Sequence, residues 1–194
     1  LYQRAMASTT RVLDLLDTEV GIIEGDLEMD RVVGEISFNK LVFSYPEREK
    51  VLDGLELVIP AGQTMGLVGS TGSGKTTLVR LLMRFHDPDS GRILLDGNHL
   101  TDLKLDSLRS SISLVSQNTT LFPGSVLDNI RYGKPDASVE SAREAANIAE
   151  ATEFIDIPPN GWHTEIGEGG HRLSGGQRQR IAIARAVLKD APIL

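Results

Sequence analysis

The sequence contains no cysteine, which excludes disulfide bonds and metal sites built from thiolates. It also lacks any run of the roughly 18 apolar residues that a membrane-spanning helix requires. Its first residues, Leu1–Arg4, do not resemble a signal peptide. Basic residues are not in excess, because 20 lysines and arginines stand against 27 acidic residues, a net charge of −7. Nucleic-acid-binding domains are usually strongly basic, so we expect no nucleic-acid partner.

The feature that organises the chain is a glycine-rich stretch, Gly69-Ser70-Thr71-Gly72-Ser73-Gly74-Lys75-Thr76-Thr77. It follows the apolar run 65–68 and precedes the periodic segment 78–84, an order that indicates strand, loop and helix. The spacing G-x-x-x-x-G-K-T is typical of loops that hold nucleotide phosphates. Glycines let consecutive backbone N–H groups face one anion, and the helix adds its positive N-terminal end.

Two side chains of this stretch carry the expected chemistry. Lys75 can reach the terminal phosphates, and the Thr76 hydroxyl is placed to ligate magnesium. The alternative is a flexible glycine turn without a ligand, which the flanking strand and helix patterns disfavour. We therefore predict a nucleotide site.

The remaining pattern predicts a mixed α/β fold with a helical insert. Alternating apolar residues predict strands at 34–45, 55–59, 64–68, 92–95 and 112–115. Helices are expected at 125–131, 139–150, 152–156 and 175–189. Another helix is predicted over 1–17 from apolar and small residues on one face, namely Ala5, Thr9, Val12, Leu13 and Leu16. We interpret it as arriving from a preceding domain through an acidic linker at 19–31; the alternative is a surface helix of the same domain.

A second glycine motif, Leu173-Ser174-Gly175-Gly176-Gln177, opens the last helix. Ser174 and Gln177, three residues apart, form a capping-box pattern. Two glycines destabilise the first turn of a helix, so an ordinary capped helix does not explain them. Their bare amides provide a second helix end suited to an anion.

These stretches resemble the ATPase domain of ABC transporters. Leu173–Gln177 resembles the signature motif of that family, residues 178–186 continue its pattern, and Gly69–Thr76 resembles its phosphate loop. Gln117 matches the glutamine of the Q-loop, and Tyr45 matches the aromatic residue that stacks on adenine. From the residues alone, Tyr45 is equally a core aromatic at a strand end and Gln117 a surface residue.

The resemblance implies a P-loop NTPase core, a mixed sheet with flanking helices, together with an ABC-type β-subdomain and a helical signature subdomain. The ATPase domain would be residues 34–194, with the helical subdomain at about 120–185. Residues 1–33 resemble the helix and linker that join the transmembrane domain of an exporter to its ATPase, as in bacterial multidrug and lipid A exporters.

The resemblance also implies the ligands, partners and location. The cofactors would be ATP and Mg²⁺, with Thr76 and Gln117 at the metal and with Lys75 and Gln117 taking part in hydrolysis. The implied partners are a second ABC domain and the transmembrane domain of the same transporter, at the cytoplasmic face of the cell membrane. Because ABC domains pair head to tail, a group of signature residues would contact the nucleotide of the partner domain, namely Ser174, Gly175, Gly176 and Gln177. ATP would join the two domains, and hydrolysis would separate them and drive export of a lipid or a drug-like substrate.

One part of the family pattern is missing from the sequence. An apolar strand ending in Asp-Glu should follow the signature helix, and residues 192–194 look like its beginning. We therefore expect the chain to be a portion of a longer protein, and by itself to fold poorly and show no ATPase activity. A non-catalytic nucleotide sensor and an ABC importer ATPase stay open as alternatives. A DNA-clamping relative is disfavoured by the short spacing between the two motifs and by the acidic charge.

Overall fold

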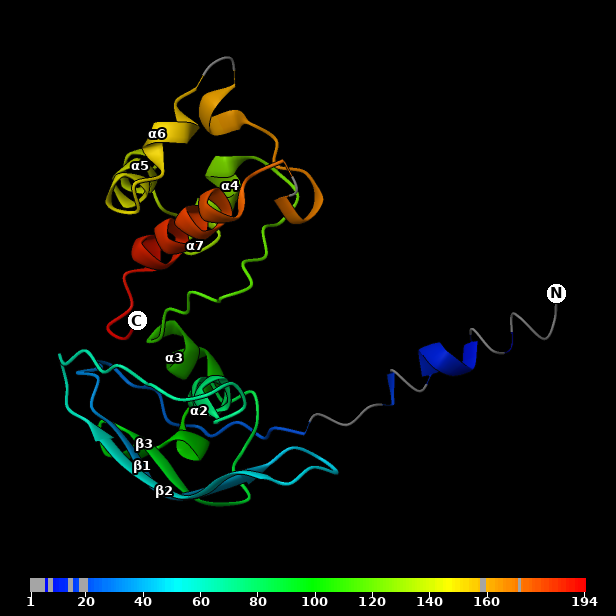
Figure 1. Cartoon of the computed structure of the whole chain (residues 1–194), viewed down its shortest axis with the longest axis vertical. Helices are drawn as coiled ribbons and strands as arrows, with labels where there is room; N and C mark the ends of the chain where they lie inside the picture. Colours follow the sequence, from blue (N-terminus) through cyan, green and yellow to red (C-terminus); the bar gives the residue numbers. More distant parts are fainter. Residues whose placement is uncertain (1–5, 7–8, 14–15, 18–20, 158–159, 171) are drawn as a thin grey trace.

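The structure is a computed structural model that describes residues 6, 9–13, 16–17, 21–157, 160–170 and 172–194. Figure 1 shows a β-rich unit that contains α2 and α3 and, beyond it, a helical unit built around α7. Each unit has its own cluster of buried apolar side chains. The two glycine motifs therefore lie on different units.

The β-rich unit is a four-stranded antiparallel sheet of order β2-β1-β3-β4. Its strands are β1 (Ile36–Ser44), β2 (Lys50–Ile59), β3 (Ser90–Leu95) and β4 (Asn98–His99). In β1 the side chains of Ile36 and Phe38 are buried, and the alternation resumes at Leu41 after an irregularity in the pairing. Lys40, at the irregularity, has a φ of 47°. The bulge shifts the two-residue period so that both halves of β1 face the same core.

One face of this sheet packs on helices that follow the glycine-rich stretch. Helix α2 (Lys75–Leu82) contributes the buried Leu78 and Leu81 to the cluster beneath the sheet. A 3₁₀ turn, η1 (Leu100–Asp102), and helix α3 (Leu105–Ser110) complete the unit. The sheet thus carries α2, and with it the predicted phosphate loop, on its inner face.

Two predicted strands are wrong for this structure. Residues 64–68 form no strand, and their side chains are exposed, Val68 fully so at 99%. At 112–115 only one parallel bridge forms, between Ile112 and Ile193, with Ser113 N–H donating to the Ile193 carbonyl over 2.7 Å. A strand needs a neighbour to pair its backbone groups, and within the described residues no segment pairs with 64–68. In the part of the chain that the structure describes, the sheet is antiparallel, and the expected mixed sheet is not formed.

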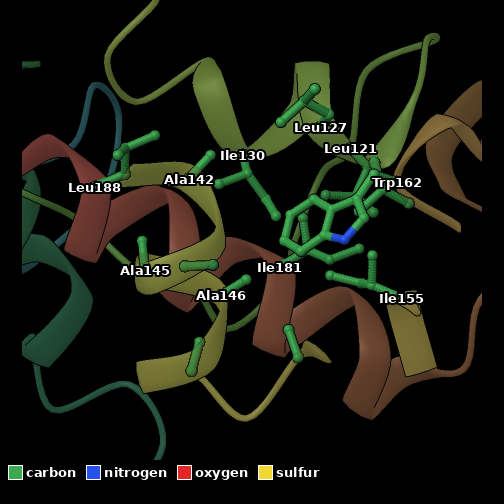
Figure 2. Close-up of a cluster of buried hydrophobic side chains, with 14 of the residues drawn as sticks. Leu121, Leu127, Ile130, Ala142, Ala145, Ala146, Ile155, Trp162, Ile181 and Leu188 are labelled. Atoms are coloured by element: carbon green, nitrogen blue, oxygen red, sulfur yellow. The ribbon is translucent and has the colours of Figure 1, made fainter. Parts of the chain in front are cut away.

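The predicted helices of the second unit are confirmed, with ends that differ by at most two residues. They are α4 (Val126–Arg131), α5 (Val139–Ile148), α6 (Thr152–Ile155) and α7 (Gly175–Lys189), with 3₁₀ turns η2 (Gly161–His163) and η3 (Glu168–Gly170) between α6 and α7. Figure 2 shows the indole of Trp162 beside Ile181 and Ile155 in the core. The indole N–H donates to Asp156 over 2.7 Å, so its polar edge is satisfied.

The arginines of α7 bind within their own unit. Arg185 donates to the main-chain oxygen of Asn129 over 3.0 Å, and its guanidinium lies 5.4 Å from the ring centres of both Phe122 and Tyr132. Arg178 donates to the Leu173 carbonyl over 2.7 Å. Arg185 is therefore packed within the helical unit and is not part of a solvated basic face.

The segment 23–34, which we call the strap, is held against the β-rich unit by hydrogen bonds. Leu27 pairs in parallel with Leu103. The carboxylate of Asp96 accepts hydrogen bonds from the N–H groups of Val33, Gly34 and Glu35 over 2.7 to 2.9 Å. The sequence predicts a linker here, and the structure gives it a fixed course along η1 and α3.

Of the predicted helix at 1–17, the described residues Met6, 9–13 and Leu16 are helical, and Asp17 lies in a turn. Its apolar side chains are exposed; Leu16 is 74% accessible. Ala5, which the prediction of this helix also used, lies outside the described residues. No helix among the described residues is long and apolar enough to cross a bilayer.

Candidate nucleotide site

The glycine-rich stretch forms a tight loop that ends in the first turn of α2. Gly72 and Gly74 have φ values of 88° and 89°, a left-handed backbone that side chains with a Cβ rarely adopt. A Cβ on Gly74 would lie 2.9 Å from Leu52 Cδ2, whereas one on Gly72 would meet nothing within 4 Å. The loop therefore needs glycine at 74 for its backbone, and a Cβ there would also crowd the Leu52 side chain of β2.

Lys75 closes this loop. Its ammonium donates to the carbonyl oxygens of Gly69 and Ser70 over 2.7 and 2.8 Å and to the Ser73 hydroxyl over 3.2 Å. The positive charge is thereby held over the concave side of the loop. Lysine in this position presents a point charge to a phosphate while the loop keeps its shape.

A cavity of about 700 Å³ brings several predicted site residues together. It is lined by Tyr45, residues 48–51, residues 71–77 and Gln117. Gly69 and Ser70 lie outside this lining, and their carbonyl oxygens accept hydrogen bonds from Lys75, which is part of it. The structure thus gathers the adenine-stacking candidate, the phosphate loop and the Q-loop candidate around one space large enough for a nucleotide.

Residues 48–51 are the part of this cavity that sequence reasoning missed. Arg48 and Glu49 directly precede β2, whose first residues are Lys50 and Val51, and all four line the cavity. Their place depends on the pairing of β1 with β2, which sets Ser44 opposite Lys50. Charge alone gives no signal for them, because charged turns are common on protein surfaces.

Tyr45 follows β1 and is held from two sides. Its ring packs edge-on against Phe43 and His86, with centroid distances of 5.0 and 5.4 Å. Its hydroxyl lies 3.3 Å from the Thr77 hydroxyl and accepts from Arg80 over 3.3 Å. The hydrogen bond with Thr77, followed by the effect of Arg80, lowers the pKa of Tyr45 below its ordinary value although burial opposes this. Tyr45 packs against the core and also lines the cavity. Its position is therefore compatible with both interpretations of the sequence, a core aromatic and a residue that stacks on adenine.

The cavity suits the two ligands that the resemblance implies. Thr76 and Gln117 offer neutral side-chain oxygens there, the ligand type that Mg²⁺ accepts alongside phosphate oxygens. Lys75, Arg48 and Lys50 supply positive charge against the single carboxylate of Glu49. This balance fits a polyanion such as a nucleoside triphosphate.

The second glycine motif begins α7 as its capping pattern predicts. The Gln177 N–H donates to the Ser174 hydroxyl over 3.2 Å, and the Ser174 N–H donates to the Gln177 side-chain oxygen over 2.9 Å. Gly175 and Gly176 are exposed. None of these residues lines the large cavity; Gly175 shares a separate space of about 250 Å³ with Gln117 and residues 118–120. The chain therefore does not bring its own signature motif to its own phosphate loop.

The difference between Gly72 and Gly74 gives a direct test of the loop. We expect Gly74→Ala to weaken ATP binding by the full-length gene product about tenfold or more, from left-handed strain of about 1–2 kcal/mol plus overlap with Leu52. Gly72→Ala, which has the strain without the overlap, should cost less. Titration with ATP measures both, and equal losses would show that the Leu52 contact relaxes freely.

The comparisons with known proteins agree with this geometry. A model of the ABC transporter family matches residues 52–194. The chain is 49% identical over 192 residues to the ATP-dependent lipid A-core flippase of Legionella pneumophila (strain Paris), covering 99% of this chain and 33% of that protein. It is 48% identical over 195 residues to the corresponding flippase of Salmonella typhimurium (strain LT2), covering 100% and 34%.

A solved structure of a bacterial Atm1-family ABC exporter with ATP bound superposes on 99% of this chain and 34% of its own, with a TM-score of 0.90 at 37% identity. An ABC-type ATPase domain is therefore the class that fold and motifs define. The chain belongs to the ABC transporter family, and the resemblance drawn from its motifs is confirmed. It spans about a third of the length of these relatives.

Proposed function

We propose that this chain is the ATP-binding domain of an ABC exporter, which binds Mg-ATP, pairs with a second such domain and couples ATP hydrolysis to export of a lipid or drug-like substrate. The observation that carries the proposal is the cavity that joins Tyr45, the phosphate loop and Gln117. The similarity to lipid A-core flippases favours an amphipathic lipid as the substrate.

Four side chains of the cavity have a stated part in this proposal, namely those of Lys75, Tyr45, Thr76 and Gln117. Lys75 and the amides at the start of α2 hold the β- and γ-phosphates, and the ring of Tyr45 lies against the base. Thr76 and Gln117 hold the magnesium ion, which neutralises charge on the phosphates when it is bound. Gln117 also orients water, since its amide both donates and accepts.

The exposed signature motif supports pairing with a second domain. Its two glycines present bare amides at the N-terminal end of a 15-residue helix, away from the phosphate loop of the same chain. In a head-to-tail pair, Ser174, Gly175, Gly176 and Gln177 face the γ-phosphate held by the partner domain. Helix ends from both domains then stabilise one polyanion, so that ATP binding favours the pair and hydrolysis weakens it.

Reconstituted vesicles test the proposal with the full-length gene product. We expect ATP-dependent movement of a lipid A-type glycolipid between leaflets and a matching stimulation of ATP hydrolysis by that lipid. The Lys75→Ala variant, reconstituted at the same density, should show neither. Lipid movement that continues without ATP would refute ATP-driven export. Nucleotide binding without any turnover would also refute the exporter function and would favour a nucleotide sensor.

A further inference from the structure

The hydroxyl of Tyr45 is tied to the helix that begins at the phosphate loop. It lies 3.3 Å from Thr77 and 3.3 Å from the guanidinium of Arg80. Thr77 and Arg80 are three residues apart, so they share one face of α2 directly after Lys75 and Thr76. Thr77 is buried at 6% exposure and belongs to the fixed part of the helix, whereas Arg80 is exposed.

The direction of the hydrogen bond between the Tyr45 hydroxyl and Arg80 is defined by the chemistry of the two groups. A guanidinium only donates, so the phenol oxygen is the acceptor toward Arg80, and between the phenol and Thr77 either hydroxyl can donate. The lowered pKa of Tyr45 agrees with this polar surrounding. Phe43 and His86 meet the ring edge-on from the other side, so that ring and hydroxyl are each restrained.

We propose that Arg80 is a positioning residue for nucleotide recognition: through the hydroxyl of Tyr45 it fixes the base-binding ring at a set place relative to the phosphate loop. This inference rests on the proposed nucleotide site. Arg80 is not among the residues that line the cavity, so it acts on the ligand through Tyr45. The sequence motifs do not single out Arg80, because neither the phosphate loop nor the base-stacking position includes it.

The base and the phosphates of a nucleotide depend on different parts of the site, so the role of Arg80 can be tested with two ligands. A nucleotide uses both the ring of Tyr45 and the loop, whereas inorganic tripolyphosphate uses the loop alone. Loss of Arg80 should therefore weaken ATP binding and leave tripolyphosphate binding unchanged. A residue that merely supports α2 would weaken both ligands together, since the loop and the start of the helix hold the phosphates.

The test titrates the full-length gene product with ATP and with tripolyphosphate, in the wild type and in the Arg80→Gln, Tyr45→Phe and doubly substituted variants. We expect each single substitution to weaken ATP binding about threefold to tenfold, the usual worth of one hydrogen bond, with tripolyphosphate unchanged. The double substitution should weaken ATP binding no more than Tyr45→Phe alone, because Arg80 acts through the hydroxyl. Arg92→Gln, an exposed arginine on β3, is the matched control and should change neither ligand.

The outcomes are distinct. Unchanged ATP affinity in Arg80→Gln overturns the inference, and so does an equal loss for ATP and tripolyphosphate. Additive losses in the double variant overturn it as well, because Arg80 would then act by another route. A wild-type protein that binds tripolyphosphate but not ATP, or neither, would instead refute the proposed nucleotide function itself.

Discussion

Replacing Lys75 by alanine is expected to lower the ATPase activity of the full-length gene product by about 100-fold or more. The ammonium is held over the loop by Gly69, Ser70 and Ser73, at distances of 2.7 to 3.2 Å. Phosphoryl transfer depends on fixed positive charge where negative charge develops, and removal of one preorganised donor typically costs about 10²–10³ in rate. Steady-state phosphate release at saturating ATP measures this loss.

The control for this prediction is a lysine of the other unit. Lys134 is exposed and lies between α4 and α5, outside the lining of the cavity. Lys134→Ala removes the same charge and the same side-chain atoms, and we expect the rate to be unchanged. A Lys75→Ala protein that keeps a tenth or more of the wild-type rate would contradict the role given to this loop.

The parts of the fold that the sequence predicts well are those that local interactions determine. The start of α7 follows from Ser174 and Gln177, whose reciprocal hydrogen bonds span only three residues. Ser125 and Asp128 form the same arrangement at the start of α4. Capping satisfies the free amides of a helix with neighbouring side chains, so it can be read without knowledge of the tertiary structure.

The parts that the sequence does not predict depend on distant partners. The run 64–68 has the apolar composition of a buried strand, yet no described segment pairs with it. The sequence pattern predicts a linker at the strap, because the residues that the strap contacts, within 96–107, lie more than 60 positions away in the sequence. Gly25 illustrates this, since a Cβ there would lie 2.1 Å from the Asp102 backbone, a constraint that no local pattern reveals.

The candidate site also has one part that local sequence patterns predict and another that depends on distant contacts. The phosphate loop and the signature motif follow from spacing, because their chemistry depends on consecutive backbone amides. The rim at 48–51 and the bond from Arg80 to Tyr45 depend on the register of β1 with β2 and on the packing of α2 beneath the sheet. Motifs therefore predict which ligand the site holds, whereas tertiary packing decides how the ligand would be oriented.

The strap provides the second large prediction, through Arg84 at the end of α2. This side chain is 3% exposed and donates to Asp87 over 2.9 and 3.3 Å, to the carbonyl oxygens of Leu100 and Thr101 over 3.4 Å, and to that of Ile23 over 2.6 Å. It connects the end of the helix that begins at the phosphate loop with the start of the strap. Replacing it by leucine removes this donor from the Asp87 carboxylate and from the carbonyl oxygens, of which only that of Leu100 has a second donor here, the Leu103 N–H over 3.3 Å, among the bonds of the described residues.

We expect Arg84→Leu to lower the free energy of opening of the strap by about 2 kcal/mol, because the strap loses the hydrogen bond from a buried guanidinium to the Ile23 carbonyl, and hydrogen bonds to charged groups contribute about 1.5–3 kcal/mol. Arg84 has a φ of 51°, and since leucine also carries a Cβ, the backbone strain at this position does not change. Arg84→Lys should recover only part of the loss, because an ammonium cannot reach as many acceptors as the planar guanidinium.

Hydrogen exchange of the strap amides measures this opening. The N–H groups of Gly25 and Leu27 donate to the carbonyls of Leu103 and Asp102, over 3.2 and 2.9 Å, and we expect their exchange in Arg84→Leu to be roughly 30-fold faster. Lys104→Ala removes the exposed ion pair between Lys104 and Glu28 and should have a much smaller effect, since exposed pairs contribute little. Equal acceleration in both variants would mean that the buried guanidinium holds the strap no more firmly than the exposed ion pair does, which would contradict the prediction. In that case the strap would depend on its pairing with Leu103 and on its hydrogen bonds to Asp96, neither of which involves Arg84.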